Sequence, residues 1–457
     1  MADIAISDRF PRYKTYDPLV PVWCVTPQTP RTIHRYFDSS PFSPSGRYLV
    51  STQLPYEDRM PVPGDAARVI VSDLATGDER CVAETKGWDT QLGAHAHWGN
   101  SDAKLLFNDL DVATWTPYGV QLDLENGRLA TFEGPIYAVS HDRRFAVTPC
   151  LKRTVLALPG YGVVVPPAQI PSTGAGSESD GIFITDLTTG NHRLLISFRR
   201  IVDSMDVFYG QRGNEAGEFV GFHVVISPDD RWILAIVRWI RLPSQYQRLA
   251  LAMRREMSRF GRKVGHWTGQ EAIRKYFAAP KMFFRTLLLV RTDGSESRVI
   301  LPADEFEQGG HHPSWSTDGR TIVMNRMSDG RMRFVRFDLE ENRWHVLSDR
   351  VFGSGHPTLF PDQRHILTDA YYSERVAAGD GTVPIRLIDW PAGTELNLVR
   401  MATRPPFLGP KMALRIDPHP ALNPSFTRVA FNGFADGTRR VYVADLSNLD
   451  LAMQQSS

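Results

Sequence analysis

The chain has 457 residues, of which 42% are hydrophobic and 23% are charged, so it is long enough to bury a large core. Its net charge of +1 gives no indication of a nucleic-acid or membrane partner. No run approaches about 18 apolar residues, the N-terminus lacks the features of a signal peptide, and the three cysteines show no metal-type spacing. We therefore expect a cytoplasmic protein with free thiols.

The first 30 residues are rich in proline and irregular, with one strand-like piece at Val20–Val25. From its position, this piece is expected to complete the last sheet of a closed ring and tie the two chain ends together. From Arg31 onward a repeat replaces the irregular pattern.

The repeat consists of short turns between apolar runs. Seven turns open the units, and they begin at Ser43, Gly99, Ser140, Ser227, Ser316, Phe360 and Asn423. Seven further turns close the units, and their aspartates are Asp73, Asp123, Asp186, Asp293, Asp338, Asp389 and Asp445. Four short strands in a unit of about 45–60 residues are typical of a propeller blade. The sequence therefore predicts an all-β fold, a seven-bladed β-propeller that forms a single domain over residues 1–457.

Two units are longer than the others. The third carries Leu156–Asp180, which is rich in Gly, Pro and Ser, and the fourth carries Arg241–Lys281. Residues 247–257 within the second insertion are basic and have high helix propensity, so a helical insertion in blade 4 is predicted. Insertions in repeat proteins fall in loops on one face. This one is interpreted as a solvated lid or a homo-oligomer contact, or as a feature that attracts an acidic ligand to the channel mouth.

Histidines recur at one position of the repeat. Counting back four residues from each opening turn gives Ser39, His95, Ile136, His223, His312, His356 and His419. Five of these seven are histidine, in a chain with 13 histidines. The strand before such a turn lines the channel, and side chains on a strand alternate faces, which groups His95 with His97 and Asp417 with His419. The pattern predicts a ring of imidazoles at one level of the channel.

Three of these histidines come from consecutive units and are predicted to bind one divalent ion. They are His312, His356 and His419, with Asp417 and His311 as further candidates. Imidazole with carboxylate suits Mn, Zn, Fe or Ni, whereas Ca prefers more oxygen ligands; Mn, Zn and Ca are kept as candidate ions. For any single histidine the alternative is a structural role, in which its ring binds a neighbouring backbone.

Two motifs in the last three units carry a resemblance to a known family. His312-Pro313-Ser314-Trp315 places a histidine before a Trp-ended inner strand, and Asp417-Pro418-His419-Pro420 lies near the C-terminus. With these motifs the chain resembles the β-propeller polysaccharide lyases, above all oligogalacturonate lyase, whose metal-ligand histidines lie in similar segments. The chain differs by Asp417 where that family has histidine, and a family glutamine ligand has no clear match near Leu414.

The resemblance implies β-elimination from an acidic, uronate-containing oligosaccharide. Ulvan and rhamnose–glucuronate lyases on similar rings use a Tyr and an Arg sixteen residues apart, a spacing shared by Tyr137 and Arg153. The reaction needs a neutralised carboxylate next to C5, a base for the C5 proton and an acid for the leaving oxygen. We expect the metal with Arg153 as the neutraliser, His95 or His97 as the base, and Tyr137 as the acid or co-base.

Other polar residues are expected to line the channel. Tyr161, His223 and His311 are predicted to contact the substrate. A second column lies nine residues after the opening turns and contains Asn108, Asn325, Asp369 and Asn432. Its members are interpreted as partners of the histidines or as capping groups at strand ends.

Two other functions remain open from the sequence. A glycoside hydrolase on the same ring would use a carboxylate pair, for which Asp369, Glu374 and Asp417 are candidates. A non-catalytic, TolB-like binding propeller would hold no metal and turn over no acidic glycan. Phosphate-binding, dinucleotide-binding and Gly-x-Ser-x-Gly motifs are absent from the sequence.

Overall fold

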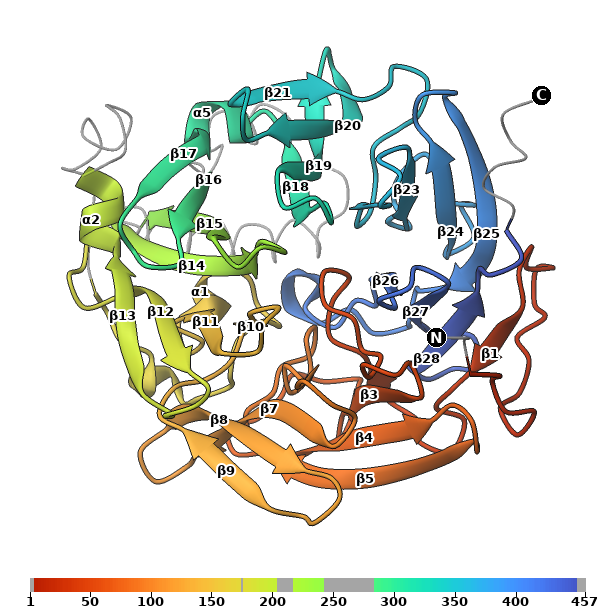
Figure 1. Cartoon of the computed structure of the whole chain (residues 1–457), viewed down its shortest axis with the longest axis horizontal. Helices are drawn as coiled ribbons and strands as arrows, with labels where there is room; N and C mark the ends of the chain where they lie inside the picture. Colours follow the sequence, from red (N-terminus) through yellow and green to blue (C-terminus); the bar gives the residue numbers. More distant parts are fainter. Residues whose placement is uncertain (1–3, 174–175, 204–216, 242–282, 450–457) are drawn as a thin grey trace, which may run out of the picture.

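The computed structural model describes residues 4–173, 176–203, 217–241 and 283–449. These residues form seven four-stranded sheets that follow one another around a central axis (Figure 1). The predicted all-β, seven-bladed propeller is confirmed. The helical insertion predicted over 241–281 falls beyond the end of β15, outside the described residues, and an oligomer contact through it stays a prediction.

The first three blades are meanders in which consecutive strands pair in chain order. Blade 1 consists of β2 (Thr32–Ile33), β3 (Tyr48–Gln53), β4 (Ala67–Asp73) and β5 (Asp78–Thr85). Blade 2 consists of β6 (His97–Trp98), β7 (Lys104–Asp111), β8 (Thr116–Asp123) and β9 (Leu129–Phe132). Blade 3 consists of β10 (Ala138–Val139), β11 (Phe145–Pro149), β12 (Gly181–Asp186) and β13 (His192–Ser197).

The next three blades have the same order of pairing. Blade 4 consists of β14 (Gly217–Ile226), β15 (Trp232–Arg241), β16 (Phe283–Arg291) and β17 (Ser297–Leu301). Blade 5 consists of β18 (Gly310–Trp315), β19 (Thr321–Ser328), β20 (Arg331–Asp338) and β21 (Arg343–Val346). Blade 6 consists of β22 (Thr358–Leu359), β23 (His365–Thr368), β24 (Thr382–Asp389) and β25 (Thr394–Ala402).

Blade 7 combines the two ends of the chain. Its three C-terminal strands are β26 (Ala421–Leu422), β27 (Arg428–Gly433) and β28 (Arg440–Asp445). The outer strand is β1 (Val22–Cys24), which pairs antiparallel with β28 through Trp23 opposite Val443 (Figure 1). Strand pairing between the N-terminal segment and the last blade therefore closes the ring.

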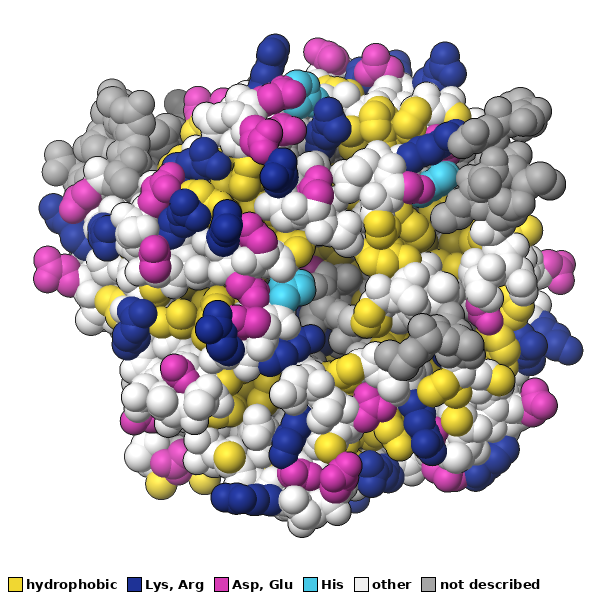
Figure 2. All heavy atoms as spheres, viewed as in Figure 1, with side chains coloured by type: hydrophobic (Ala, Val, Ile, Leu, Met, Phe, Trp, Pro, Cys, Tyr) yellow, Lys and Arg dark blue, Asp and Glu magenta, His cyan; other side chains and the backbone are white. Residues whose placement is uncertain are grey.

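Helices in the described residues are short and lie in connections between strands. They are α1 (Thr154–Ala157), η1 (Pro167–Gln169), α2 (Phe198–Asp203), α5 (Ala303–Phe306) and η2 (Pro410–Met412). No helix in this part of the chain is long and apolar enough to cross a membrane. Charged side chains of both signs are interspersed over the face shown in Figure 2, in keeping with the net charge of +1.

The aspartates that close the units explain why the repeat is visible in the sequence. Oδ1 of Asp186 accepts hydrogen bonds from the backbone N–H groups of Thr188 and Thr189, at 2.7 and 2.8 Å. Asp73 and Asp338 form the same Asx turn in blades 1 and 5. Each of these carboxylates reverses the chain between the two outer strands of its blade.

Candidate functional site

The inner strands bring four of the five column histidines around one side chain, Tyr36. This tyrosine follows β2 in blade 1 and is only 4% exposed. Its ring centroid lies 4.5 Å from that of His419, 5.2 Å from His223, 5.6 Å from His356 and 6.3 Å from His312. The four imidazoles therefore surround a single aromatic ring where the innermost strands of the blades meet.

Three column histidines have a backbone conformation that is uncommon for residues other than glycine. The φ angle is 53° at His95, 55° at His312 and 50° at His419, in the left-handed region. At His312 the pairing of β18 with β19 also shifts register between His311 and Ser314. Side chains do not alternate regularly at these points. The left-handed backbone conformation of each histidine therefore sets the direction in which its imidazole points.

His356, Asp417 and His419 form a buried group that could hold a metal ion. One ligand atom from each side chain lies within 4.8 Å of the others, and Nε2 of His419 lies 3.8 Å from Oδ2 of Asp417. Among the described residues, Nε2 of His356 and both ring nitrogens of His419 have no hydrogen-bond partner, although buried polar atoms normally have one. Two atoms each about 2.1 Å from one ion lie at most about 4.2 Å apart. The distance between His419 and Asp417 is within this limit, whereas the 4.8 Å bound on the whole group is wider, so one divalent cation would draw the three side chains slightly closer together. The free imidazole nitrogens fit such an ion.

A second carboxylate, Asp369, orients this group. Its oxygens lie 2.9 and 3.0 Å from Nδ1 of His356, and they accept the backbone N–H groups of His356 at 2.8 Å and His419 at 3.2 Å. The contact with Nδ1 leaves Nε2 of His356 free toward the ligand group. Gly355 allows this approach, because a Cβ atom at that residue, where φ is 67°, would lie 2.2 Å from Oδ1 of Asp369.

Asp369 belongs to the second polar column, whose members bind backbone groups next to the inner strand of the following blade. The other bonds join Asn108 to Ile136, Asn325 to Gly355, and Asn432 to His34, at 2.7 to 3.0 Å. This column therefore links neighbouring blades. In blade 6 it also supplies the carboxylate that orients an imidazole.

Burial favours the neutral form of His419, His312, His311 and His34. It lowers the pKa of His419 and of His312 well below the usual value, and the neighbouring His356 adds to the effect. Burial also lowers the pKa of His311 to about 3 and that of His34 to about 4. A neutral imidazole has the lone pair that binds a metal or accepts a proton.

His312 lies beside the ligand group, but its ring nitrogens face other partners. Its ring stacks on His356 with the centroids 3.9 Å apart. Nδ1 lies 2.8 Å from the carbonyl of Gly355, and Nε2 lies 3.1 Å from the hydroxyl of Tyr371. His311 is adjacent, with its Nδ1 2.9 Å from Nδ1 of His312. Of the four predicted metal ligands, the structure groups three and pairs the fourth with a tyrosine.

Arginines lie next to the ligand group and near the adjacent histidines. Nε of Arg415 is 2.7 Å from Oδ2 of Asp417, and its Nη2 donates to the hydroxyl of Tyr161 at 2.9 Å. Arg238 on β15 and Arg285 on β16 are directly opposite in blade 4. Burial, together with the charge of Arg285, lowers the pKa of Arg238 to about 10. Like charges in opposite positions repel, and the charge of Arg285 is offset by Glu307, whose Oε1 lies 3.9 Å from its Nε.

The two histidines expected to act as the base lie near Tyr137 and are held by other groups. Nε2 of His95 lies 3.2 Å from Oδ2 of the buried Asp89. Nε2 of His97 lies 3.2 Å from the carbonyl of Tyr137, and its Nδ1 lies 3.1 Å from the hydroxyl of Ser39. Both contacts are of the kind expected for structural histidines.

Tyr137 and His223 are brought into direct contact. The hydroxyl of Tyr137 lies 2.7 Å from Nδ1 of His223, and Nε2 of His223 lies 3.0 Å from Oδ2 of Asp38. All three side chains are buried, Tyr137 to 1% exposure. The predicted acid and a predicted substrate contact therefore form one hydrogen-bonded unit.

Arg153 is placed in a buried ion cluster between blades 3 and 4. Its guanidinium pairs with Asp180, lies 2.5 Å from Glu218, and donates to the carbonyl of Phe219 at 2.9 Å. Burial raises the pKa of Asp180, although Arg153 opposes this effect. Within the described residues, no hydrogen bond or ion pair of Arg153 reaches a column histidine.

Several residues of the site carry no signal in the repeat pattern. They are Tyr36, Asp38, Tyr371, Arg285 and Arg415, which lie outside both columns. Tyr36 and Asp38 follow a two-residue strand, so no regular offset from a turn marks them. Three of them do lie close to a position that the pattern singles out: Asp38 directly precedes Ser39, Tyr371 is two residues after Asp369, and Arg415 is two residues before Asp417.

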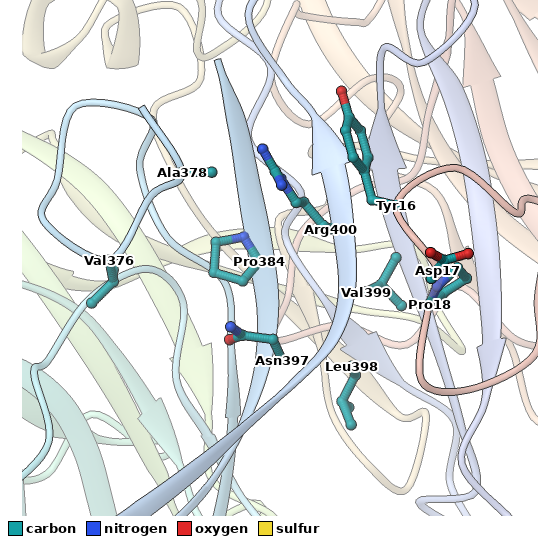
Figure 3. Close-up of a pocket in the computed structure, with 10 residues that line it drawn as sticks. All are labelled: Tyr16, Asp17, Pro18, Val376, Ala378, Pro384, Asn397, Leu398, Val399 and Arg400. Atoms are coloured by element: carbon teal, nitrogen blue, oxygen red, sulfur yellow. The ribbon is translucent and has the colours of Figure 1, made fainter. Parts of the chain in front are cut away.

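A separate pocket of about 290 Å³ lies between β25 of blade 6 and the N-terminal segment (Figure 3). Tyr16, Asn397 and Arg400 are among its lining residues. The guanidinium of Arg400 lies 4.4 Å from the Tyr16 ring centroid and also pairs with Asp380. No column histidine lines this pocket.

Comparison with known proteins supports the fold. No protein-family model matches the sequence, and no curated protein matches it. A solved structure named as oligogalacturonate lyase in complex with manganese superimposes with a TM-score of 0.60 and 15% identity, covering 98% of each chain. An oligogalacturonate lyase from Vibrio parahaemolyticus gives a TM-score of 0.60 and 16% identity, covering 97% of this chain and 98% of the other. At this identity the likeness establishes a common fold.

Proposed function

We propose that this protein is a lyase that cleaves a uronate-containing oligosaccharide by β-elimination, with a divalent metal held by His356, Asp417 and His419. The observation that carries the proposal is the buried ligand group with its unpartnered imidazole nitrogens. The shared fold supports it, since two structures of this fold are named as oligogalacturonate lyases and one of them contains manganese.

The donor set favours a transition metal over calcium. Two imidazoles and one carboxylate suit Mn, Fe or Zn, whereas Ca requires more oxygen ligands. When bound, such an ion acts as a Lewis acid toward the uronate carboxylate and makes the C5 proton more acidic. Arg415 contacts Asp417 and is therefore the guanidinium best placed to bind that carboxylate. In this proposal Arg415 neutralises the uronate carboxylate, the role that the sequence spacing between Tyr137 and Arg153 suggested for Arg153.

Elimination also needs groups that move protons, and the site offers two pairs of imidazole and phenol. One pair is His312 with Tyr371, and the other is His223 with Tyr137. In both pairs an imidazole nitrogen lies within hydrogen-bond distance of a tyrosine hydroxyl, the arrangement needed for proton transfer.

Asp369 provides a direct test of the metal-binding group. Changing Asp369 to Asn is expected to lower manganese affinity by about 10–100-fold, because the partner that orients His356 loses its charge. Calorimetric titration with Mn²⁺ measures the effect. The matched control is Asp362→Asn, which alters the carboxylate 2.6 Å from His365 at the opening turn of blade 6. Unchanged affinity in Asp369→Asn would contradict the proposed ligand geometry.

The product distinguishes β-elimination from hydrolysis. Incubation of the manganese-loaded protein with oligouronates is expected to produce a conjugated, unsaturated uronate that absorbs in the ultraviolet, in step with new reducing ends. New reducing ends without that absorbance would identify a hydrolase instead. The structure gives this alternative little support, because its candidate carboxylates are engaged: Asp369 by His356, Glu374 by Ser354, and Asp417 by Arg415.

A further inference from the structure

Three connections between strands meet at Arg415, beside the ligand group. Arg415 itself lies between β25 and β26, and its backbone is held by Thr90 and Gln91 from the connection between β5 and β6. The carbonyl of Ala413 accepts hydrogen bonds from Oγ1 of Thr90 at 2.8 Å and from Nε2 of Gln91 at 2.9 Å. The same amide of Gln91 donates to the carbonyl of Arg415 at 3.2 Å. The backbone from which the Arg415 side chain projects is therefore fixed by another blade.

Tyr161 comes from the third of these connections, between β11 and β12, and is only 5% exposed. The glycine on each side of it allows a close approach of the chain. At Gly160, where φ is 95°, a Cβ atom would lie 2.7 Å from the carbonyl oxygen of Ala413. At Gly162 the backbone N–H donates to Oδ2 of the buried Asp89 at 2.9 Å. The segment that carries Tyr161 is therefore packed directly on the segment that carries the arginine.

Arg415 and Tyr161 retain hydrogen-bond donors that lack an acceptor. A guanidinium has five N–H groups, and the contacts of Arg415 engage three of them. Nε lies 2.7 Å from Oδ2 of Asp417, Nη2 donates to the Tyr161 hydroxyl at 2.9 Å, and Nη1 lies 3.4 Å from the carbonyl of Met412. Because the Tyr161 oxygen accepts that bond, its own proton is left to donate, and the described residues give this hydroxyl no other partner. Two N–H groups and one O–H are therefore left for a ligand, since buried donors normally have an acceptor.

The guanidinium of Arg415 lies where the ligand group approaches the surface. The side chain of Arg415 is 13% exposed, whereas that of Asp417 is 6% exposed. Met412, which precedes Arg415 in the same connection, is 37% exposed. A ligand that approaches from the side of Met412 therefore meets the guanidinium first, with the metal-binding carboxylate behind it.

We propose, on the basis of the proposed function, that Tyr161 and Arg415 bind the uronate carboxylate together and that Tyr161 selects the free acid over its ester. One carboxylate oxygen accepts from Arg415 and the other accepts from the Tyr161 hydroxyl, in hydrogen bonds strengthened by the charge of the ligand. A methyl ester has no charge and carries a methyl group on one of these oxygens, so it leaves a buried donor unpaired. The substrate class is therefore an oligosaccharide whose uronate at the cleaved linkage is unesterified.

Calorimetric titration of galacturonic acid and of its methyl ester into the protein in excess Mn²⁺ tests this role without turnover, because a monosaccharide has no leaving sugar. Wild type is expected to bind the acid more tightly than the ester. Tyr161→Phe is expected to weaken binding of the acid about 10–100-fold and to change binding of the ester and of Mn²⁺ by less than about threefold. The matched control is Tyr118→Phe, which removes a hydroxyl that donates to Oδ2 of Asp109 at 3.1 Å on the third strand of blade 2.

A second variant tests whether the two residues act together. Arg415→Lys keeps the positive charge but presents a single nitrogen, which cannot contact Asp417, Tyr161 and a ligand in the same geometry. It is expected to weaken binding of the acid at least as much as Tyr161→Phe does. Adding Tyr161→Phe to it is expected to weaken binding by less than about threefold more, because neighbouring groups that act as a unit are not additive. A full additional loss would contradict the joint role.

The outcomes separate this role from a structural one and from the proposed function. Equal weakening of the acid and the ester in Tyr161→Phe would indicate a structural role and overturn the selection by Tyr161, and so would unchanged affinity for the acid. A wild-type protein that binds the acid no more tightly than the ester would overturn the whole carboxylate site. A wild-type protein that prefers the acid but produces no unsaturated uronate from oligouronates would contradict the elimination and leave the carboxylate site supported.

Discussion

A variant in which His356 and His419 are both changed to alanine is expected to lose stoichiometric metal and all elimination activity. In structural zinc sites, a binding free energy of about 10–16 kcal/mol shared over four ligands corresponds to about 3 kcal/mol for each ligand. Losing two imidazoles therefore lowers affinity by more than about 10⁴-fold. Asp417 alone cannot compensate, because it supplies only one of the three side chains of the ligand group.

Elemental analysis of the purified double variant, with a manganese titration followed by thermal unfolding, measures this loss. Wild type is expected to be stabilised by added Mn²⁺, since a ligand that binds only the folded state raises its stability. The control is His141→Ala, because His141 is a solvent-exposed histidine in the opening turn of blade 3. Metal content that is equal in the double variant and wild type would show that the ion binds elsewhere.

Changing Arg153 to methionine is expected to lower the free energy of unfolding by about 3–5 kcal/mol. The substitution leaves Asp180 and Glu218 buried side by side without the guanidinium that pairs with both. Removing one partner of a buried ion pair costs far more than removing an exposed one, for which the change is typically below about 1 kcal/mol. Arg144→Met is therefore the control, because Arg144 is an exposed arginine that pairs with Asp142.

Urea denaturation of the two arginine variants measures the difference. The structural role predicts that Arg153→Met unfolds at a much lower urea concentration, and that Arg153→Met/Asp180→Asn/Glu218→Gln recovers part of the loss by removing the stranded charges. If Arg153→Met unfolds as wild type does and is inactive, the neutralising role expected from its spacing to Tyr137 would be restored.

The blade architecture could be predicted because its signals are local. A closing aspartate such as Asp186 accepts hydrogen bonds from backbone N–H groups two and three residues further on. The turn is therefore determined by a few consecutive residues. The histidine column was visible for the same reason, as a fixed offset from a local turn. That offset brought His312, His356 and His419 together, because consecutive inner strands begin at similar depth in the ring.

The details of the site could not be predicted, because they depend on contacts between blades and on unusual backbone angles. The left-handed φ of His312 and His419 turns their side chains in a way that no alternation rule gives. Asp38 meets His223 although the two are far apart in sequence. Arg153 has the expected distance in sequence from Tyr137, but the fold places its guanidinium against Asp180 and Glu218. Spacing along the chain carries no information on such pairings.

Anomalous X-ray scattering from crystals grown with Mn²⁺ tests directly whether an ion binds between blades 6 and 7, as proposed. The predicted result is a single strong manganese peak about 2.1–2.2 Å from Nε2 of His356, a ring nitrogen of His419 and a carboxylate oxygen of Asp417. A fully occupied manganese peak elsewhere, with these three side chains unliganded, would contradict it.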